Sequence, residues 1–193
     1  MDKIGETHQG TLDMAFFRLV PNLTIMAPKD FKEFEDMLEY AIEQKKPVVI
    51  RYPRGGESKE KFEKHEKIEM GKAEIIKNGE DITIIAIGKM VAKAKKMAER
   101  LEEKDENKTV EIINARFLKP LDKETIKKSI EKTKNVITIE DGTIINGLAT
   151  AVKELIIDNE IKDVKIKTYA YPDEFIKHGG VEELEEIYGF NRL

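Results

Sequence analysis

The sequence predicts an α/β protein in which a mostly parallel sheet has helices on both faces, preceded by a partial α/β domain. From about residue 70 onward, short apolar runs alternate with amphipathic segments, which is typical of parallel strands joined by helices. Before residue 55 there are only two apolar runs and one amphipathic segment, too few to cover both faces of a sheet. We therefore expect residues 1–55 to be the second half of a domain and residues 70–193 to form a compact domain of their own.

The partial domain is expected to contain a strand, a helix and a second strand. Residues 23–26 form a short apolar run that Pro28 ends, and Asp30 with Glu33 predicts the capping box of a helix. Residues 48–50 are apolar throughout and predict a fully buried strand. The apolar side chains at helical spacing between the two strands are Phe31, Phe34, Leu38, Ala41 and Ile42.

A charged segment separates the two parts. Residues 56–69 lack apolar periodicity and predict a solvated linker. Beyond it, strands are expected at residues 73–76, 82–87, 110–113, 136–139 and 164–169. The intervening helices are indicated by capping or inward-facing residues, namely Met90, Ala94, Met97, Ala98 and Leu101, then Asp122, Ile126 and Ile130, then Leu148, Ala151, Val152, Leu155 and Ile156.

Composition excludes several function classes. Lys and Arg number 34 against 38 Asp and Glu, with the signs mixed along the chain, so no basic surface for nucleic acid is expected. No apolar run approaches the roughly 20 residues of a membrane span, and the amino terminus has no apolar signal region. The absence of cysteine excludes disulfides and thiolate catalysis. These features predict a cytoplasmic protein without membrane or nucleic-acid partners.

Two short polar clusters stand where catalytic loops are expected. Thr7-His8-Gln9-Gly10 lies near the amino terminus, and Arg51-Tyr52-Pro53-Arg54-Gly55 directly follows the strand at residues 48–50. Ligands in open α/β sheets bind at the carboxyl ends of strands, so the second cluster has a favourable location.

These clusters and a series of later motifs resemble the C-terminal portion of the 1-deoxy-D-xylulose-5-phosphate synthases, thiamine-diphosphate enzymes related to transketolase. The series continues with Asn114-Ala115-Arg116-Phe117, Thr138-Ile139-Glu140 and Pro172-Asp173-Glu174-Phe175-Ile176 with His178-Gly179. Each motif alone is weak, but their order spans nearly the whole chain. The resemblance implies a partial pyrimidine-binding domain over residues 1–55, a linker over residues 56–69 and a transketolase C-terminal domain over residues 70–193.

The resemblance also implies an activity and a set of partners. Members condense pyruvate with glyceraldehyde 3-phosphate, lose CO2 and supply isoprenoid and thiamine precursors, using thiamine diphosphate and Mg2+. They are homodimers. Their cofactor carries the electrons, while the protein positions substrates and transfers protons.

Site residues follow from the same resemblance. His8 matches the active-site histidine, and an imidazole can donate a proton to a developing alkoxide near neutral pH. Arg54 matches the arginine that binds the substrate phosphate, for which a guanidinium is suited by its paired donors. Thr7 and Gln9 flank His8 in the family's register. Arg51 points to the opposite side of its strand and is expected to form a structural ion pair, whereas Tyr52 is expected to pack.

Other polar residues remain open between a functional and a structural role. Glu140 and Asp141 end a strand, where carboxylates often only cap the following helix or bind loop amides. His178 matches a family loop but is equally suited to capping or packing. Arg116 is similarly ambiguous. His65 is expected to be solvated, and the three histidines lack metal-ligand spacing, so no protein-bound transition metal is predicted.

The diphosphate and Mg2+ motif of the family cannot be found in this sequence, and Ile4 stands where the family usually has an acidic residue. We therefore expect the chain by itself to be inactive and to need a missing N-terminal region or subunit. Alternatives are the C-terminal subunit of a split transketolase, a 2-oxoacid dehydrogenase β-type chain, or a non-enzymatic assembly module with the same fold. The DNA upstream of the Met1 codon would distinguish a fragment from a split enzyme.

Overall fold

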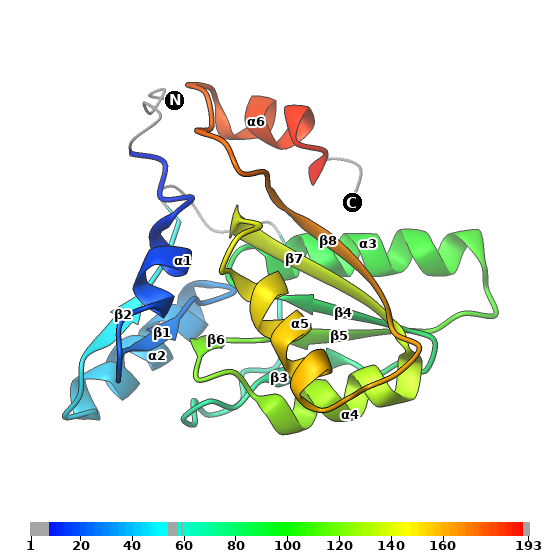
Figure 1. The fold of residues 1–193 in the computed structure, drawn as a ribbon, viewed down its shortest axis with the longest axis horizontal. Helices are drawn as coiled ribbons and strands as arrows, with labels where there is room; N and C mark the ends of the chain where they lie inside the picture. Colours follow the sequence, from blue (N-terminus) through cyan, green and yellow to red (C-terminus); the bar gives the residue numbers. More distant parts are fainter. Residues whose placement is uncertain (1–7, 54–57, 59, 191–193) are drawn as a thin grey trace.

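The computed structural model describes residues 8–53, 58 and 60–190, and it contains two sheets (Figure 1). Ile4, Thr7 and Arg54, which carry predictions made from the sequence, lie outside the described residues. The smaller sheet has the strand order β2-β1-β6, with β1 over Thr24–Met26, β2 over Val48–Ile50 and β6 over Phe117–Lys119. Strands β1 and β2 are parallel, and β6 is antiparallel to β1.

The larger sheet has the strand order β3-β5-β4-β7-β8. Its strands are β3 (Glu74–Lys77), β4 (Ile82–Ala86), β5 (Val110–Asn114), β7 (Asn135–Thr143) and β8 (Lys165–Tyr171). All neighbours are parallel except β3, which is antiparallel to β5. The predicted mostly parallel α/β fold is confirmed, with one antiparallel strand at the edge of this sheet.

Six helices accompany the two sheets in the described part of the chain. They are α1 (Asp13–Arg18), α2 (Phe31–Glu43), α3 (Met90–Lys104), α4 (Lys123–Thr133), α5 (Leu148–Asp158) and α6 (Val181–Ile187). None of the described helices is long and apolar enough to cross a membrane. The short helices α1 and α6 and strand β6 were missed from sequence, because six or seven helical residues, or three residues of a strand, give too little periodicity to recognise.

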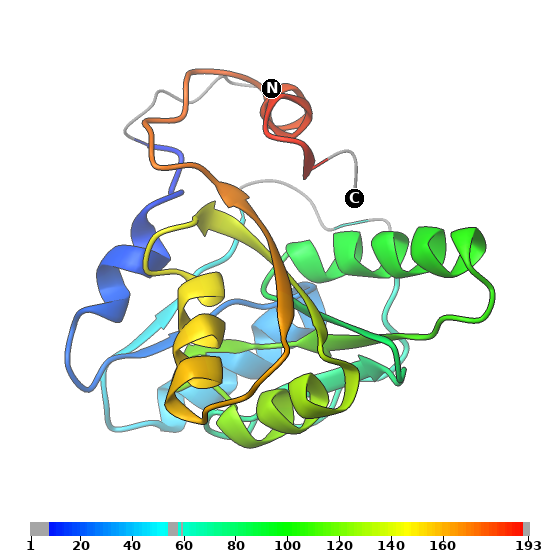
Figure 2. The ribbon, with the colours of Figure 1, turned by 45° about the vertical axis from the view of Figure 1, so that its right-hand side comes forward.

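Alternating side chains of the central strand β4 hold helices on the two faces of the larger sheet. Ile84 belongs to the core beneath α3, whereas the neighbouring Ile85 belongs to the core beneath α4 and α5. Figure 2 shows α3 on one side of this sheet and α4 and α5 on the other. The prediction of helices on both faces is therefore confirmed.

The two sheets share one hydrophobic core. Ile25 of β1 and Leu118 of β6 are buried in the same cluster as Ile130 of α4 and Val152 of α5. Strand β6 follows β5 in the chain but pairs with β1. The smaller sheet is therefore completed by residues 117–119, which lie after the charged linker. The division at residues 56–69 stays a prediction, but any boundary there separates segments that pack together extensively.

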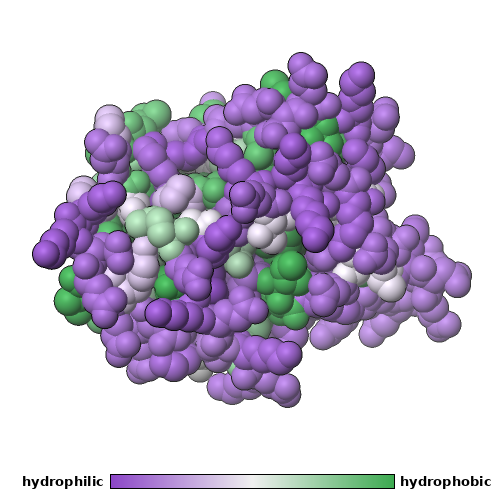
Figure 3. Space-filling view, turned by 90° about the horizontal axis from the view of Figure 1, so that it is seen from below, coloured by the Kyte–Doolittle hydropathy of each residue, from purple (hydrophilic) through white to green (hydrophobic). Residues whose placement is uncertain are grey.

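The smaller sheet keeps part of its apolar surface exposed. β2 was predicted to be fully buried, and this prediction is wrong: Val48, Val49 and Ile50 are each half-buried, because β2 is an edge strand. Helix α2 buries Met37 against this sheet, while Ile42 on its outer side is 78% exposed. On the face shown in Figure 3, by contrast, hydrophilic residues predominate and hydrophobic ones form small separate patches.

Two predictions about the start of α2 and the linker need correction. Asp30 caps α2 by accepting from the Glu33 amide at 2.8 Å, but the Glu33 carboxylate accepts from the Lys29 amide and not from that of Asp30. His65 is not solvated: its Nε2 lies 2.7 Å from Asp30 Oδ2, and its side chain is 22% exposed. Ile68 is buried as well, so the end of the linker is packed against the protein.

Candidate functional site

Four chain segments meet at the carboxyl ends of β2 and β7. The segment that follows His8 contacts β7, where the Thr143 amide donates to the Thr11 carbonyl at 2.9 Å. The same segment contacts the loop after β8, where Gln9 Nε2 donates to the Lys177 carbonyl at 2.9 Å. His8 directly precedes Gln9, and His178 directly follows Lys177; both histidines are exposed. The structure thus brings together the segments that carry His8, Gln9 and His178.

Arg51 joins this meeting point from the end of β2. Its amide donates to the Met26 carbonyl at 2.8 Å, which continues the parallel pairing with β1. Its Nη1 lies 2.7 Å from Asp141 Oδ2, with the two side chains 14% and 9% exposed. The expectation that Arg51 forms an ion pair is confirmed. Tyr52 packs against Phe34 with ring centroids 4.8 Å apart, although it remains exposed.

Asp141 binds a second cation. Lys89, just before α3, places its Nζ 3.0 Å from the same Oδ2 atom. Lys89 follows β4, whose carboxyl end lies at the same edge of the sheet as that of β7. One carboxylate therefore joins β2 of the smaller sheet to the start of α3, and sequence reasoning had assigned no role to this contact.

Glu140 points away from Asp141 and caps α5. Its carboxylate accepts from the Leu148 amide at 2.7 Å and from the Ala149 amide at 2.9 Å. Burial raises the pKa of Glu140 to about 7, although the hydrogen bonds from these two amides oppose the shift. Of the two roles left open from sequence, the structure provides the contacts for capping.

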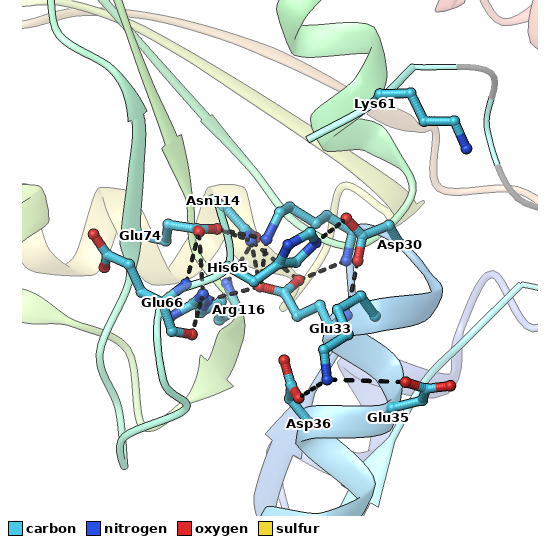
Figure 4. Close-up of polar contacts among 12 residues, drawn as sticks. Asp30, Glu33, Glu35, Asp36, Lys61, His65, Glu66, Glu74, Asn114 and Arg116 are labelled. Carbon is cyan, nitrogen blue, oxygen red and sulfur yellow. Dashed lines mark hydrogen bonds and ion pairs between the residues drawn. The ribbon is translucent and has the colours of Figure 1, made fainter. Parts of the chain in front are cut away.

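A separate ionic cluster lies between the smaller sheet and the larger one. Arg116 Nε lies 2.7 Å from Glu33 Oε1, and its Nη2 lies 3.2 Å from Glu74 Oε1. Lys29 Nζ lies 3.1 Å from Glu33 Oε1 and 2.7 Å from Glu74 Oε2. Figure 4 shows Glu33, Glu74, Asn114 and Arg116 pointing toward one another. The side chains of Lys29, Glu33, Glu74 and Arg116 are each at most 3% exposed. Arg116 therefore takes part in a buried network that joins structural elements.

The cluster also holds the end of the linker. Arg116 donates through Nη2 to the Glu66 carbonyl at 3.0 Å, and its own carbonyl accepts from the Ala27 amide at 2.9 Å. Its φ of 54° is unusual for a residue other than glycine, and these contacts on both sides keep it there. The sequence signal for this cluster was the Asn114-Ala115-Arg116-Phe117 motif, but its acidic partners are 40 or more residues away.

The chemistry available at the strand ends is that of cations, imidazoles and amides. Among the described residues, no group of three or more His, Cys, Asp or Glu side chains is arranged to hold a metal ion. The imidazoles of His8 and His178 can donate or accept a hydrogen bond, and a guanidinium suits a phosphate or carboxylate. This set fits the binding of a small anionic substrate and proton transfer to it.

Comparison with known proteins gives matches along nearly the whole chain. A family model for "Transketolase, C-terminal domain" matches residues 71–192, and one for "Transketolase, pyrimidine binding domain" matches residues 1–56. The chain is 43% identical over 186 residues to a 1-deoxy-D-xylulose-5-phosphate synthase of Desulforudis audaxviator, covering 96% of this chain and 29% of that protein. A synthase of Dictyoglomus turgidum is 44% identical over 189 residues, which is 97% of this chain and 30% of that protein. The chain thus spans about 30% of the length of these relatives.

Solved structures show the same fold. A structure described as "Split gene transketolase, inactive beta4 tetramer" has a TM-score of 0.84 and 33% identity, over 96% of this chain and 59% of that one. Transketolase from Campylobacter jejuni has a TM-score of 0.62 at 18% identity, over 96% of this chain and 27% of that one, and supports the fold alone. The chain belongs to the transketolase family, with that family's C-terminal domain preceded by a segment of its pyrimidine-binding domain.

Proposed function

We propose that this chain is the C-terminal part of a 1-deoxy-D-xylulose-5-phosphate synthase and that it works with the region those relatives carry beyond it. In the proposed reaction, pyruvate loses CO2 and its remaining two-carbon unit is joined to the aldehyde carbon of glyceraldehyde 3-phosphate. The product is a precursor for isoprenoid and thiamine synthesis. The cytoplasmic location and homodimeric state expected from the resemblance stay predictions.

The observation that carries the proposal is the meeting of four segments at the carboxyl ends of β2 and β7. The hydrogen bond from Gln9 to the Lys177 carbonyl and the ion pair between Arg51 and Asp141 hold these segments together. Open α/β folds bind their substrates at this edge, formed by the carboxyl ends of the strands. The identity of about 40% to synthases extends over both sides of this meeting point.

Residue roles in the proposal follow the chain's own chemistry. His8 is exposed at the start of the meeting segment, and we assign it the donation of a proton to the oxygen that becomes an alkoxide as the new C–C bond forms. Arg54 lies three residues after Arg51 and is assigned the phosphate of the acceptor. Thr7, Gln9 and His178 are assigned supporting contacts around His8.

The residues named above are not sufficient to bind the cofactor. Thiamine diphosphate, when bound, stabilises the carbanion left by decarboxylation of pyruvate. The described residues do not fit its Mg2+ and diphosphate: Asp141 already binds Arg51 and Lys89, and Glu140 is engaged with two amides of α5. We propose that the region of the relatives outside this chain holds the metal and the diphosphate.

The second candidate is the C-terminal subunit of a split transketolase. It is favoured by the structural match to the split-gene transketolase, of which this chain covers 59%. The two candidates use related chemistry but differ in their substrates. Pyruvate as donor supports the synthase, whereas a ketose phosphate as donor supports the transketolase.

Arg54→Ala in the complete enzyme tests the assignment. Loss of a charge-assisted contact of about 2 to 4 kcal/mol should lower kcat/KM for glyceraldehyde 3-phosphate about 30-fold to 1000-fold. Pyruvate and unphosphorylated glyceraldehyde should be affected little, and Arg54→Lys should recover only part of the activity. Equal losses for phosphorylated and unphosphorylated acceptors would mean that Arg54 supports the loop. If pyruvate is no substrate of the parent enzyme, the synthase assignment is wrong.

A further inference from the structure

The carboxyl-terminal segment after β8, residues 172–190, is anchored in the core of the larger sheet. Ile176 is 2% exposed, whereas the next residue, Lys177, is exposed. Ile176 packs in the core beneath α3 together with Leu184 and Phe190, which follow it. Both ribbon views draw α6 beyond the carboxyl ends of β7 and β8 (Figure 1, Figure 2). We call this segment the C-terminal clamp.

Polar contacts hold the C-terminal clamp to itself and to α3. The Tyr188 hydroxyl donates to the Glu174 carboxylate at 2.9 Å, which ties the end of α6 to the loop before it. Glu185 Oε2 lies 3.0 Å from Lys93 Nζ of α3. The position of the loop at residues 172–178 therefore depends on how α6 is docked.

The C-terminal clamp contacts the His8 segment, residues 8–12, through a backbone carbonyl. Gln9 Nε2 donates to the Lys177 carbonyl at 2.9 Å, although the two residues are 168 positions apart in the chain. Lys177 directly follows the buried Ile176, so the core restrains the position of its carbonyl. This hydrogen bond links the docking of α6 to the residue next to His8.

Local structure does not fix the His8 segment. Helix α1, which follows it, is only six residues long, and its N-cap residue Leu12 makes no side-chain cap. Gly10 has a φ of +69°, a left-handed conformation that belongs to neither a helix nor a strand. The segment instead relies on long-range contacts, namely the hydrogen bond to the C-terminal clamp and one from the Thr143 amide to the Thr11 carbonyl at 2.9 Å.

We propose that the C-terminal clamp is a positioning element for His8: it holds the His8 segment through Gln9, so the orientation of His8 depends on the docking of α6. The clamp lies in the part of the chain that matches the transketolase C-terminal domain, whereas His8 lies in the part that matches the pyrimidine-binding domain. The clamp touches no substrate in this proposal. Its consequence for catalysis rests on the proposed function, whereas the contact itself does not.

Amide hydrogen exchange of this chain tests the contact directly. The Thr143 amide is the reporter, because its hydrogen is bonded to the Thr11 carbonyl and is released when the His8 segment leaves. Gln9→Ala and Ile176→Ala should each make this amide exchange about 10-fold faster. The Leu148 amide, which is bonded to Glu140, should change less than about twofold.

Met97→Ala provides a matched control. Met97 is buried in the same core beneath α3 but lies on α3, outside the C-terminal clamp. This variant should lower the stability of the whole domain and make the Thr143 and Leu148 amides exchange faster by the same factor. Gln9 is only partly buried, so Gln9→Ala decides the question even if Ile176→Ala does not fold.

Steady-state kinetics of the complete enzyme test the consequence for His8. Gln9→Ala should lower kcat about 10-fold and change the KM for pyruvate less than about twofold, because a misplaced imidazole weakens proton transfer and not substrate binding. In a His8→Ala background, Gln9→Ala should cause no further loss, because its effect passes through the imidazole.

The possible outcomes separate this inference from the proposed function. A Thr143 amide that exchanges at the parent rate in Gln9→Ala, or that speeds up only as much as the Leu148 amide, would overturn the clamp. An equal loss of kcat from Gln9→Ala with and without the His8 imidazole would overturn the positioning of His8 while the synthase assignment stands. A complete enzyme that does not condense pyruvate with glyceraldehyde 3-phosphate would overturn the proposed function, and the exchange rates of this chain would still decide whether the clamp holds the His8 segment.

Discussion

Arg116→Met should strongly destabilise this chain, because it removes one cation from a buried cluster of two cations and two anions. In the wild type, Arg116 and Lys29 balance Glu33 and Glu74, and all four side chains are at most 3% exposed. After the substitution two carboxylates share one ammonium, so one negative charge is left buried without a partner. Breaking a buried pair in this way costs about 3 to 5 kcal/mol of the free energy of unfolding.

The assay is urea unfolding of the chain, followed by far-UV circular dichroism at constant pH and salt. Lys127→Met is the control, because Lys127 pairs with Glu131 at 3.8 Å on the outer surface of α4, with the two side chains 39% and 49% exposed. Its loss should cost about 0.3 to 0.5 kcal/mol. A double variant with Glu33→Met as well should lose less than the two single losses added together, because the pair is then removed as a unit.

The reasoning would be refuted by a loss for Arg116→Met as small as that of Lys127→Met. It would also be refuted by strict additivity in the double variant, since the two residues would then contribute independently. In either case the cluster would not act as a single network, and the hydrophobic core alone would account for the joining of the two sheets.

Three further predictions concern stability and one concerns activity. The pKa of Glu140 is raised from an ordinary 4.5 to about 7, so the folded state binds more protons than the unfolded state in this pH range. The free energy of unfolding should therefore fall by up to about 3 kcal/mol as the pH rises from 4.5 to 7. Glu140→Gln should flatten this slope when the free energy of unfolding is measured by urea titration at several pH values. Gly147→Ala should lower Tm, because a Cβ there would lie 2.1 Å from Glu140 Oε2 and would push the Glu140 carboxylate away from the amides of α5 that it caps. Gly180→Ala should not lower Tm, because a Cβ there would meet no atom within 4 Å. Equal Tm values for the two variants would contradict this. Limited trypsin digestion should cut first after Lys64, which is exposed. The two fragments should still elute together in size-exclusion chromatography, because β1 and β6 pair across the cut. Separate elution would show that the two sheets do not hold together. With thiamine diphosphate and Mg2+, this chain alone should release no CO2 from pyruvate above a His8→Ala control.

Regular periodicity in the sequence was sufficient to predict most of the fold. Apart from β6, the strands and helices from β3 to β8 were found because each has apolar residues at the spacing that faces a core. Asp122 caps α4 as predicted, by accepting from the Thr125 amide. The polar motif around His8 and the arginines after β2 were also visible, because the residues of each motif are contiguous in the chain.

Tertiary structure decided which of these residues meet. The partners of Arg116, Arg51 and His65 lie tens of residues away in the sequence, and no local pattern specifies such pairs. The pairing of β6 with β1 likewise depends on a three-residue strand whose antiparallel partner precedes the linker. Side-chain spacing reports which face of an element is apolar, whereas burial and charge pairing depend on what that face packs against. For this reason the sequence predicted the elements and the motif residues, and only the folded chain decided the half-exposed edge at β2, the capping role of Glu140 and the two-cation contact of Asp141.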